Sequence, residues 1–169
     1  MKGTISLDDG RKLVVNIDEE TLAAITYVEK NGYERNDERF EYYYVHTNEV
    51  LKAYDLMEGD ATARYNSANY YATEALAAMN ARADTLKRKL RRFSVEHRTD
   101  GLSWGNSKLK YCISYNHSKH QLDVVSDTTI QSSETTYFDT EKAAKDAMNK
   151  FKEDLTWYFT EYSDIIKGE

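Results

Sequence analysis

The chain has 169 residues, 31% of them charged, a formal net charge of −6 and a single cysteine, Cys112. This length is sufficient for one domain with a buried core, and one cysteine excludes a disulfide within the chain. No run of 18 apolar residues and no basic-then-apolar leader occurs in the sequence. We therefore expect neither a membrane span nor a secretory signal, and a cytoplasmic location.

The N-terminal part, residues 1–32, is predicted to be a β-hairpin followed by a short helix. An Asp-Gly pair at positions 9 and 10 supplies a tight turn between two β-like runs within residues 3–17. Asp18 is a candidate N-cap for a helix over residues 19–29, and Gly32 can end that helix.

The first long module, residues 40–98, begins with β-like patterns and ends in the clearest helix of the chain. Strands are expected over residues 40–46 and 50–57, with a weaker strand or an irregular segment over 62–69. A helix is expected over residues 73–98, because its apolar residues recur at alternating steps of three and four. These residues are Leu76, Met79, Ala83, Leu86, Leu90 and Phe93.

The second module, residues 108–166, repeats this order. Strands are expected over residues 109–116, 122–126 and 135–138, and a helix over 140–165. In both modules an aromatic pair ends a β-like run and a Thr-Glu pair opens the helix, as Tyr70-Tyr71-Ala72-Thr73-Glu74 and Tyr137-Phe138-Asp139-Thr140-Glu141. The alternative explanation of the match is that Thr-Glu openings and Ala-rich first turns are common capping chemistry.

The predicted fold class is therefore α+β. We expect a single domain, residues 1–169, with an antiparallel sheet and two long helices formed by an internally duplicated hairpin–strand–helix unit. The N-terminal hairpin and short helix precede that duplicated unit.

The charges divide along the chain. Residues 1–60 carry 14 acidic and 7 basic side chains, whereas residues 61–107 carry 4 acidic and 8 basic ones. The densest basic segment comprises Lys87, Arg88, Lys89, Arg91 and Arg92. These cations either line a phosphate backbone or form a solvated helix face that pairs with acidic residues of the chain.

No catalytic or metal-binding motif is evident. His117 and His120 near Asp123 fall on a predicted hairpin tip, and their spacing matches none of the strong zinc patterns. Cys112 is expected to be a small buried side chain on a strand, because no base is indicated beside it. We therefore predict a non-enzymatic protein without cofactor or metal, whose oligomeric state the sequence leaves open.

Six segments of the chain form a recognisable pattern: Tyr42-Tyr43-Tyr44-Val45, Asn69-Tyr70-Tyr71-Ala72-Thr73-Glu74, Leu86-Lys87-Arg88 with Phe93, Glu96 and His97, Trp104-Gly105-Asn106, Lys110-Tyr111-Cys112-Ile113-Ser114-Tyr115-Asn116-His117 and Tyr137-Phe138-Asp139-Thr140-Glu141. Together these segments resemble a family of small proteins encoded by bacteriophages and prophages. The resemblance covers almost the whole chain. The chain departs from the family pattern at Ala72 and Cys112, where a larger residue is expected.

The resemblance implies a phage accessory protein. Such proteins often inhibit host defence, anti-CRISPR proteins included, by occupying a surface of a host protein. The acidic residues expected to meet the basic nucleic-acid channel of such a host effector are Asp8, Asp9, Glu34, Asp37, Glu38 and Glu41. The alternative is a nucleic-acid-binding phage regulator that uses the basic helix over residues 82–98.

Overall fold

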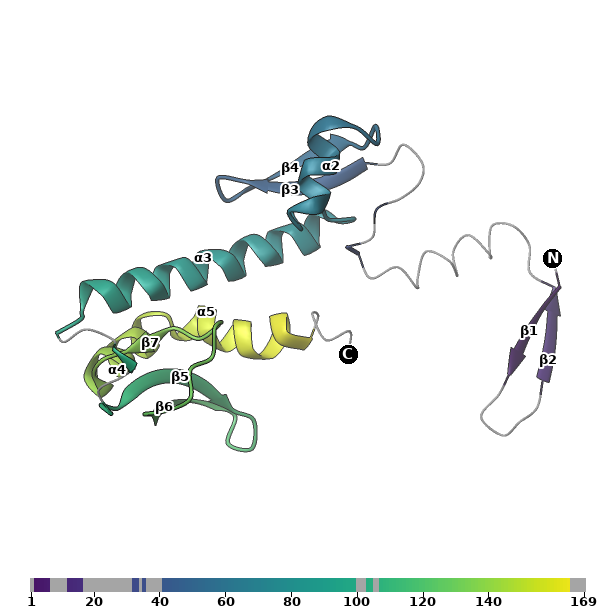
Figure 1. Cartoon of the computed structure of the whole chain (residues 1–169). Helices are drawn as coiled ribbons and strands as arrows, with labels where there is room; N and C mark the ends of the chain where they lie inside the picture. Colours follow the sequence, from purple (N-terminus) through teal and green to yellow (C-terminus); the bar gives the residue numbers. More distant parts are fainter. Residues whose placement is uncertain are drawn as a thin grey trace. The chain divides into compact units, whose positions relative to one another are not determined.

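The computed structural model describes residues 2–6, 12–16, 32, 33, 35, 41–99, 103, 104 and 107–164. Across these residues the chain is α+β, as predicted, and combines antiparallel strand pairs with one long helix and several shorter ones (Figure 1). The chain divides into two compact units. Unit 1 comprises Met1–Tyr44 and Lys52–Glu74, and unit 2 comprises Val45–Leu51 and Ala75–Glu169.

The predicted N-terminal hairpin is confirmed in its two strands. β1 (Lys2–Ser6) pairs antiparallel with β2 (Lys12–Asn16). The predicted turn between them and the predicted helix over residues 19–29 lie outside the described residues.

The second predicted hairpin is also confirmed, as β3 (Glu41–His46) and β4 (Glu49–Tyr54). Its two turn residues, Thr47 and Asn48, have φ values of 52° and 73°. Positive φ at both central residues is the backbone that a two-residue turn between right-twisted strands requires. β4 ends earlier than predicted, because Asp55 turns inward and is fully buried.

The weaker strand or irregular segment predicted over residues 62–69 is wrong for residues 62–66, because these belong to the helix α2 (Gly59–Asn66). Packing against other residues of unit 1, rather than an apolar pattern of its own, stabilises this helix. Its Ala61 is buried in a cluster with Tyr42 and Tyr70, whose rings stack at 4.5 Å. Arg64 adds a guanidinium 3.7 Å from the centre of the Tyr44 ring.

Tyr71 returns the chain to the hairpin after α2. Its backbone forms an isolated antiparallel bridge with Tyr43, with N–H···O distances of 2.8 and 2.9 Å. The aromatic pair Tyr70–Tyr71 therefore lies beside the first strand of the hairpin and is buried, immediately before the long helix begins.

The long helix is confirmed as α3 (Glu74–Glu96). Of the predicted apolar stripe, Leu76, Ala83, Leu86 and Phe93 are buried. Within unit 2, Ala83 packs in a cluster with Trp157 and Tyr162, which accounts for a residue as small as alanine in the stripe.

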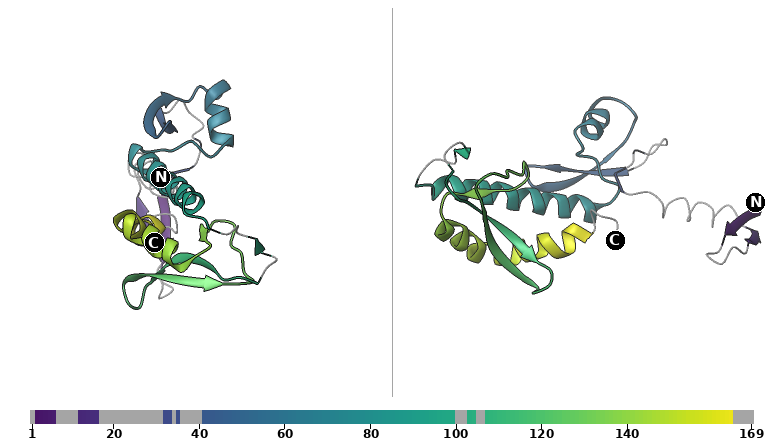
Figure 2. Two further views of the ribbon diagram at one scale, coloured as in Figure 1. Left: turned by 90° about the vertical axis from the view of Figure 1, so that its left-hand side faces the viewer. Right: turned by 60° about the horizontal axis from the view of Figure 1, so that its bottom comes forward.

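The sheet of unit 2 is formed by β5 (Lys110–Asn116), β6 (Gln121–Asp127) and β7 (Tyr137–Phe138), in the order β6-β5-β7. All three strands are confirmed within a few residues. The helix α4 (Glu141–Lys150) lies beside this sheet (Figures 1 and 2). Its fully buried Ala144 and Ala147 pack in one cluster with Phe138 of β7.

The last predicted helix is not continuous. It breaks at Phe151, whose φ and ψ of −112° and 22° are not helical, and resumes as α5 (Lys152–Trp157) and the wider π-helical turn η2 (Tyr158–Tyr162). The rings of Phe151 and Phe93 pack edge-to-face with their centroids 5.9 Å apart, so tertiary packing of the Phe151 ring accompanies the break. Residue 165, the predicted end of this helix, lies outside the described residues.

Candidate interaction surfaces

Unit 1 exposes three large apolar side chains where β4 ends. The exposed fractions are 64% for Tyr54, 63% for Leu56 and 45% for Met57. We call these three residues the apolar loop. Single exposed apolar residues are ordinary, but three within four positions form a surface suited to contact another protein.

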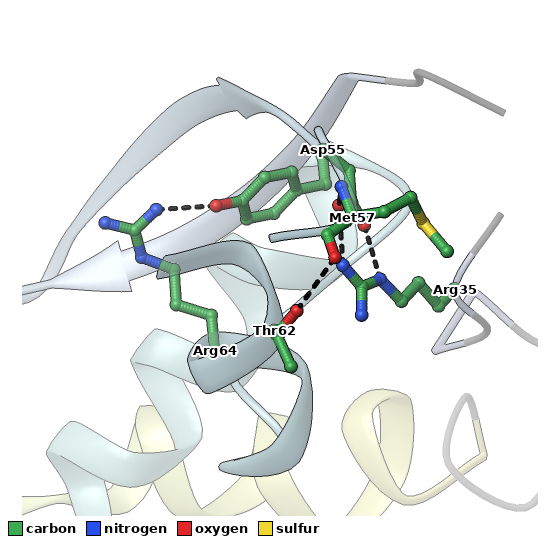
Figure 3. A network of polar contacts seen from close by, with 6 residues as sticks. Arg35, Asp55, Met57, Thr62 and Arg64 are labelled. Carbon is green, nitrogen blue, oxygen red and sulfur yellow. Dashed lines mark hydrogen bonds and ion pairs between the residues drawn. The ribbon is translucent and has the colours of Figure 1, made fainter. Parts of the chain in front are cut away.

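A buried ion pair fixes the backbone of this loop (Figure 3). The guanidinium of Arg35 donates to both carboxylate oxygens of Asp55, from Nε to Oδ2 at 2.7 Å and from Nη2 to Oδ1 at 2.8 Å. The backbone N–H of Met57 donates to Oδ1 of the same carboxylate at 2.7 Å. Asp55 thus joins a distant residue of the chain to the backbone of the apolar loop.

The charge of Asp55 is strongly favoured in this setting. Hydrogen bonding by Arg35, together with the Met57 N–H, lowers the Asp55 pKa to about 2, against the opposing effect of burial. Burial, with the neighbouring Asp55 carboxylate, raises the pKa of Tyr70 to about 12. The carboxylate is therefore ionised and the phenol is neutral at physiological pH.

The backbone of the apolar loop is strained. Met57 has a φ of 61°, in the left-handed region that residues other than glycine rarely adopt, and Gly59, two residues later, has a φ of 53°. Such a conformation costs on the order of 1 kcal/mol and persists only when surrounding contacts hold it. Here the Asp55–Met57 hydrogen bond supplies one such contact.

The chain beside the apolar loop is acidic. Glu58 and Asp60 are both exposed, and Asp60 has Arg64 near it at 3.4 Å. The Arg64 guanidinium also donates to the Tyr42 hydroxyl at 2.5 Å and covers the Tyr44 ring, so this cation is shared within unit 1. The surface that a partner meets here combines apolar side chains with negative charge.

Of the predicted acidic partner-binding residues, only Glu41 lies among the described residues; Asp8, Asp9, Glu34, Asp37 and Glu38 do not. Glu41 is exposed at the start of β3. It pairs across the hairpin with Lys52 at 2.6 Å and accepts a hydrogen bond from the Tyr54 hydroxyl at 3.0 Å. The hydrogen bond from Lys52 is the main reason that the Glu41 pKa is lowered.

The residues of the predicted basic segment of α3 contact different partners within unit 2. Lys89 lies 4.0 Å from Asp154, which Arg82 contacts at 2.8 Å. Arg92 pairs with Glu96 one turn later at 3.7 Å. Arg88 donates to Asn48 at the turn of the β3–β4 hairpin, and the Lys87 ammonium lies 5.7 Å from the centre of the Tyr158 ring.

Arg91 lines a groove of about 310 Å³ in unit 2. Arg98, Trp104 and Tyr137 line the same groove. From the sequence, Arg98 is grouped with Arg91 only as part of the basic helix over residues 82–98, and Trp104 is grouped with neither. No local pattern indicates that the helix ends at Glu96 or that Trp104 lines the same groove as the two arginines.

Asp123, His117 and Cys112 are engaged in hydrogen bonding and packing within the protein. Asp123 accepts hydrogen bonds from Asn116 at 3.2 Å and Gln121 at 2.9 Å. His117 packs edge-on against Tyr115, and burial raises the pKa of the half-buried Cys112 thiol. Within the described part of the chain, no group of three or more His, Cys, Asp or Glu side chains is arranged to hold a metal ion.

Comparison with protein-family models, curated proteins and solved structures gives no match. Among the helices of the described residues, none is long and apolar enough to span a membrane.

Proposed function

We propose that the protein is a non-enzymatic interaction protein encoded by a bacteriophage or prophage, which acts in the cytoplasm of the bacterial host. It binds a host protein and inhibits a defence system, and a CRISPR effector is the first partner to test. The phage origin rests on the resemblance given above. The mode of action rests on the exposed surface of unit 1.

The observation that carries the proposal is the apolar loop, whose backbone is held by the buried Asp55 carboxylate and its partner Arg35. Binding energy in protein interfaces concentrates in a few large anchors, and aromatic residues are frequent among them. Tyr54, Leu56 and Met57 provide such anchors. The Asp55–Arg35 pair holds the Met57 backbone before any partner arrives, which reduces the ordering entropy lost on binding.

The charge of the surroundings favours a basic partner. Exposed Glu58 and Asp60 flank the apolar loop, and residues 1–60 as a whole carry 14 acidic against 7 basic side chains. CRISPR effectors hold their nucleic acid in a positively charged channel. Opposite charge speeds association and orients the partners, so an acidic unit 1 is suited to compete for such a channel.

The test is retention of purified CRISPR effectors on the tagged protein, alongside pull-downs from host lysates with and without those effectors. We expect Leu56→Asp to weaken retention by at least about 30-fold, since loss of a central anchor costs about 2 kcal/mol or more. Ile130→Asp is the matched control, because Ile130 is 68% exposed in unit 2. Retention of no effector, or equal retention of both variants, contradicts the proposal.

We further propose that residues 40–98 and 108–166 descend from one duplicated unit. The aromatic pairs support this, because Tyr71 pairs antiparallel with Tyr43 and the equivalent Phe138 pairs antiparallel with Tyr111. Both pairs therefore return to the first strand of their hairpin. Equivalent Ala77 and Ala144 are also both fully buried. An experimental structure in which the two sets of strands fail to superpose would contradict the duplication.

A nucleic-acid-binding regulator is the second candidate function. The observation that favours it is the groove lined by Arg91 of the basic helix α3 and by Arg98, two residues beyond the end of that helix. This candidate concerns unit 2, whereas the protein-binding proposal concerns unit 1, and each can be tested without the other.

A further inference from the structure

Two arginines at the C-terminal end of α3 line one groove of unit 2. Arg91 lies in the last turns of the helix, and Arg98 lies two residues beyond its last residue, Glu96. Between them, Ser94 donates from its hydroxyl to the backbone oxygen of Tyr137 at 2.6 Å. This bond ties the helix to β7, so the groove has a fixed floor between two elements.

The two guanidinium groups are not neutralised by the described part of unit 2. Among the described residues no carboxylate forms an ion pair with Arg91 or Arg98, in contrast to Arg82, Lys89 and Arg92. One carboxylate, Glu134, also lines the groove, and it is exposed to solvent. The charged side chains described in the groove therefore leave a positive balance, which suits an anionic ligand.

An aromatic surface accompanies these charges. Trp104 packs edge-to-face with Tyr137, with ring centroids 4.9 Å apart. Tyr137 is itself fixed, because its hydroxyl accepts from the backbone N–H of Ser132 at 3.0 Å. The indole of Trp104 is only half-buried. A partly exposed indole on a fixed support, next to two guanidiniums, is the combination by which proteins stack a base and hold its phosphates.

We propose that this groove binds single-stranded nucleic acid, with a base on Trp104 and phosphates on Arg91 and Arg98. The inference rests on the second candidate function and narrows it from the whole basic helix to three residues. A single strand fits better than a duplex, because its unstacked bases can turn into a small groove. Arg88 and Arg92, which lie near Arg91 in the sequence, then take no part in binding. Arg88 donates to Asn48, and Arg92 pairs with Glu96.

The experiment measures the binding of a fluorescent oligothymidylate of about 12 nucleotides, a length within the usual range of single-strand sites. Each neutralised phosphate of a single strand contributes a slope of about 0.7 in log affinity against log salt. Two phosphates give a slope of about 1.4, so affinity should fall about sevenfold between roughly 50 and 200 mM salt.

Two double variants with the same loss of charge separate the groove from diffuse attraction. Arg91→Gln with Arg98→Gln should reduce affinity by at least about tenfold and flatten the salt dependence. Arg88→Gln with Arg92→Gln should leave affinity within about twofold, as expected for surface changes outside a site. An equal loss in both doubles would overturn the groove while leaving nucleic-acid binding in place.

Intrinsic fluorescence tests the stacking directly. The chain has two tryptophans, and Trp157 is only 8% exposed, so stacking should quench the emission of Trp104. Trp104→Leu should abolish the quenching and weaken binding at least about fivefold. No oligonucleotide binding by the folded protein overturns both the groove and the second candidate function. Displacement by a free mononucleotide at the same concentration, or equally tight duplex binding, overturns the assignment to a single strand.

Discussion

At the scale of the residue, Asp55 organises the apolar loop. A fully buried carboxylate keeps its charge only when donors surround it, and Arg35 and the Met57 N–H supply three hydrogen bonds. Since the bond to Met57 holds a left-handed residue, Asp55 links the stability of unit 1 to the shape of its exposed surface. A small change at Asp55 therefore tests both.

Asp55→Asn should destabilise the protein by about 2 kcal/mol, because it removes charge-assisted hydrogen bonds and leaves Arg35 partly unpaired. The measurement is urea denaturation followed by circular dichroism. Glu58→Gln, three residues later on the exposed chain, is the control and should change stability by less than about 0.5 kcal/mol. Equal effects of the two variants would show that the ion pair contributes nothing specific.

The same carboxylate predicts an acid sensitivity. The folded pKa of Asp55 is about 2, below its ordinary value of 3.8. Its contribution to stability is therefore complete above the ordinary value and is lost as the pH falls toward 2. We expect the stability difference between the native chain and Asp55→Asn to shrink between about pH 6 and about pH 2.5. A difference that stays constant over this range would contradict a lowered pKa.

At the scale of the element, α4 begins at a side-chain cap. The Thr140 hydroxyl accepts a hydrogen bond from the backbone N–H of Ala143 at 3.2 Å. Thr140→Ala should destabilise unit 2 by about 1 kcal/mol, whereas Thr140→Ser keeps an accepting oxygen and should cost little. Urea denaturation monitored by tryptophan fluorescence measures this change, since both tryptophans lie in unit 2. Identical losses for the two variants would exclude the cap as the cause.

The elements also differ in how far the sequence predicts them. The aromatic pairs and α3 are predicted because their patterns are long and regular. α2 is missed, because its short polar sequence forms a helix only when Ala61 packs against Tyr42 and Tyr70. The break at Phe151 is missed because its ring contacts Phe93, far away in the sequence. Such elements depend on tertiary contacts, which local patterns do not contain.

The candidate sites follow the same physical rule. The basic residues of positions 87–92 form one group in the sequence because they are adjacent. In the structure, the direction of each side chain and its packing decide which residues lie together. Arg91 shares its groove with Arg98, which follows the end of α3, whereas its neighbour Arg92 pairs with Glu96. The apolar loop was predicted as the end of a strand, since nothing local indicates that Asp55 is buried and Met57 exposed.

At the scale of the whole molecule, the two proposed surfaces belong to different units, the apolar loop to unit 1 and the groove to unit 2. Changes at independent sites without shared partners usually add in free energy. We therefore expect the two binding activities to be separable by mutation.

Met57→Gly is suited to test this separation. Glycine adopts the φ of 61° without strain, so stability should hold or rise slightly while the exposed side chain is lost. We expect Met57→Gly to weaken retention of the host partner at least about fivefold, as for loss of an interface side chain worth about 1 kcal/mol, and to leave oligothymidylate binding unchanged. Arg91→Gln with Arg98→Gln should do the reverse. The combined variant, measured in both assays, should show the sum of the separate losses within about 0.5 kcal/mol. A larger deviation would mean that the two units act as one binding surface.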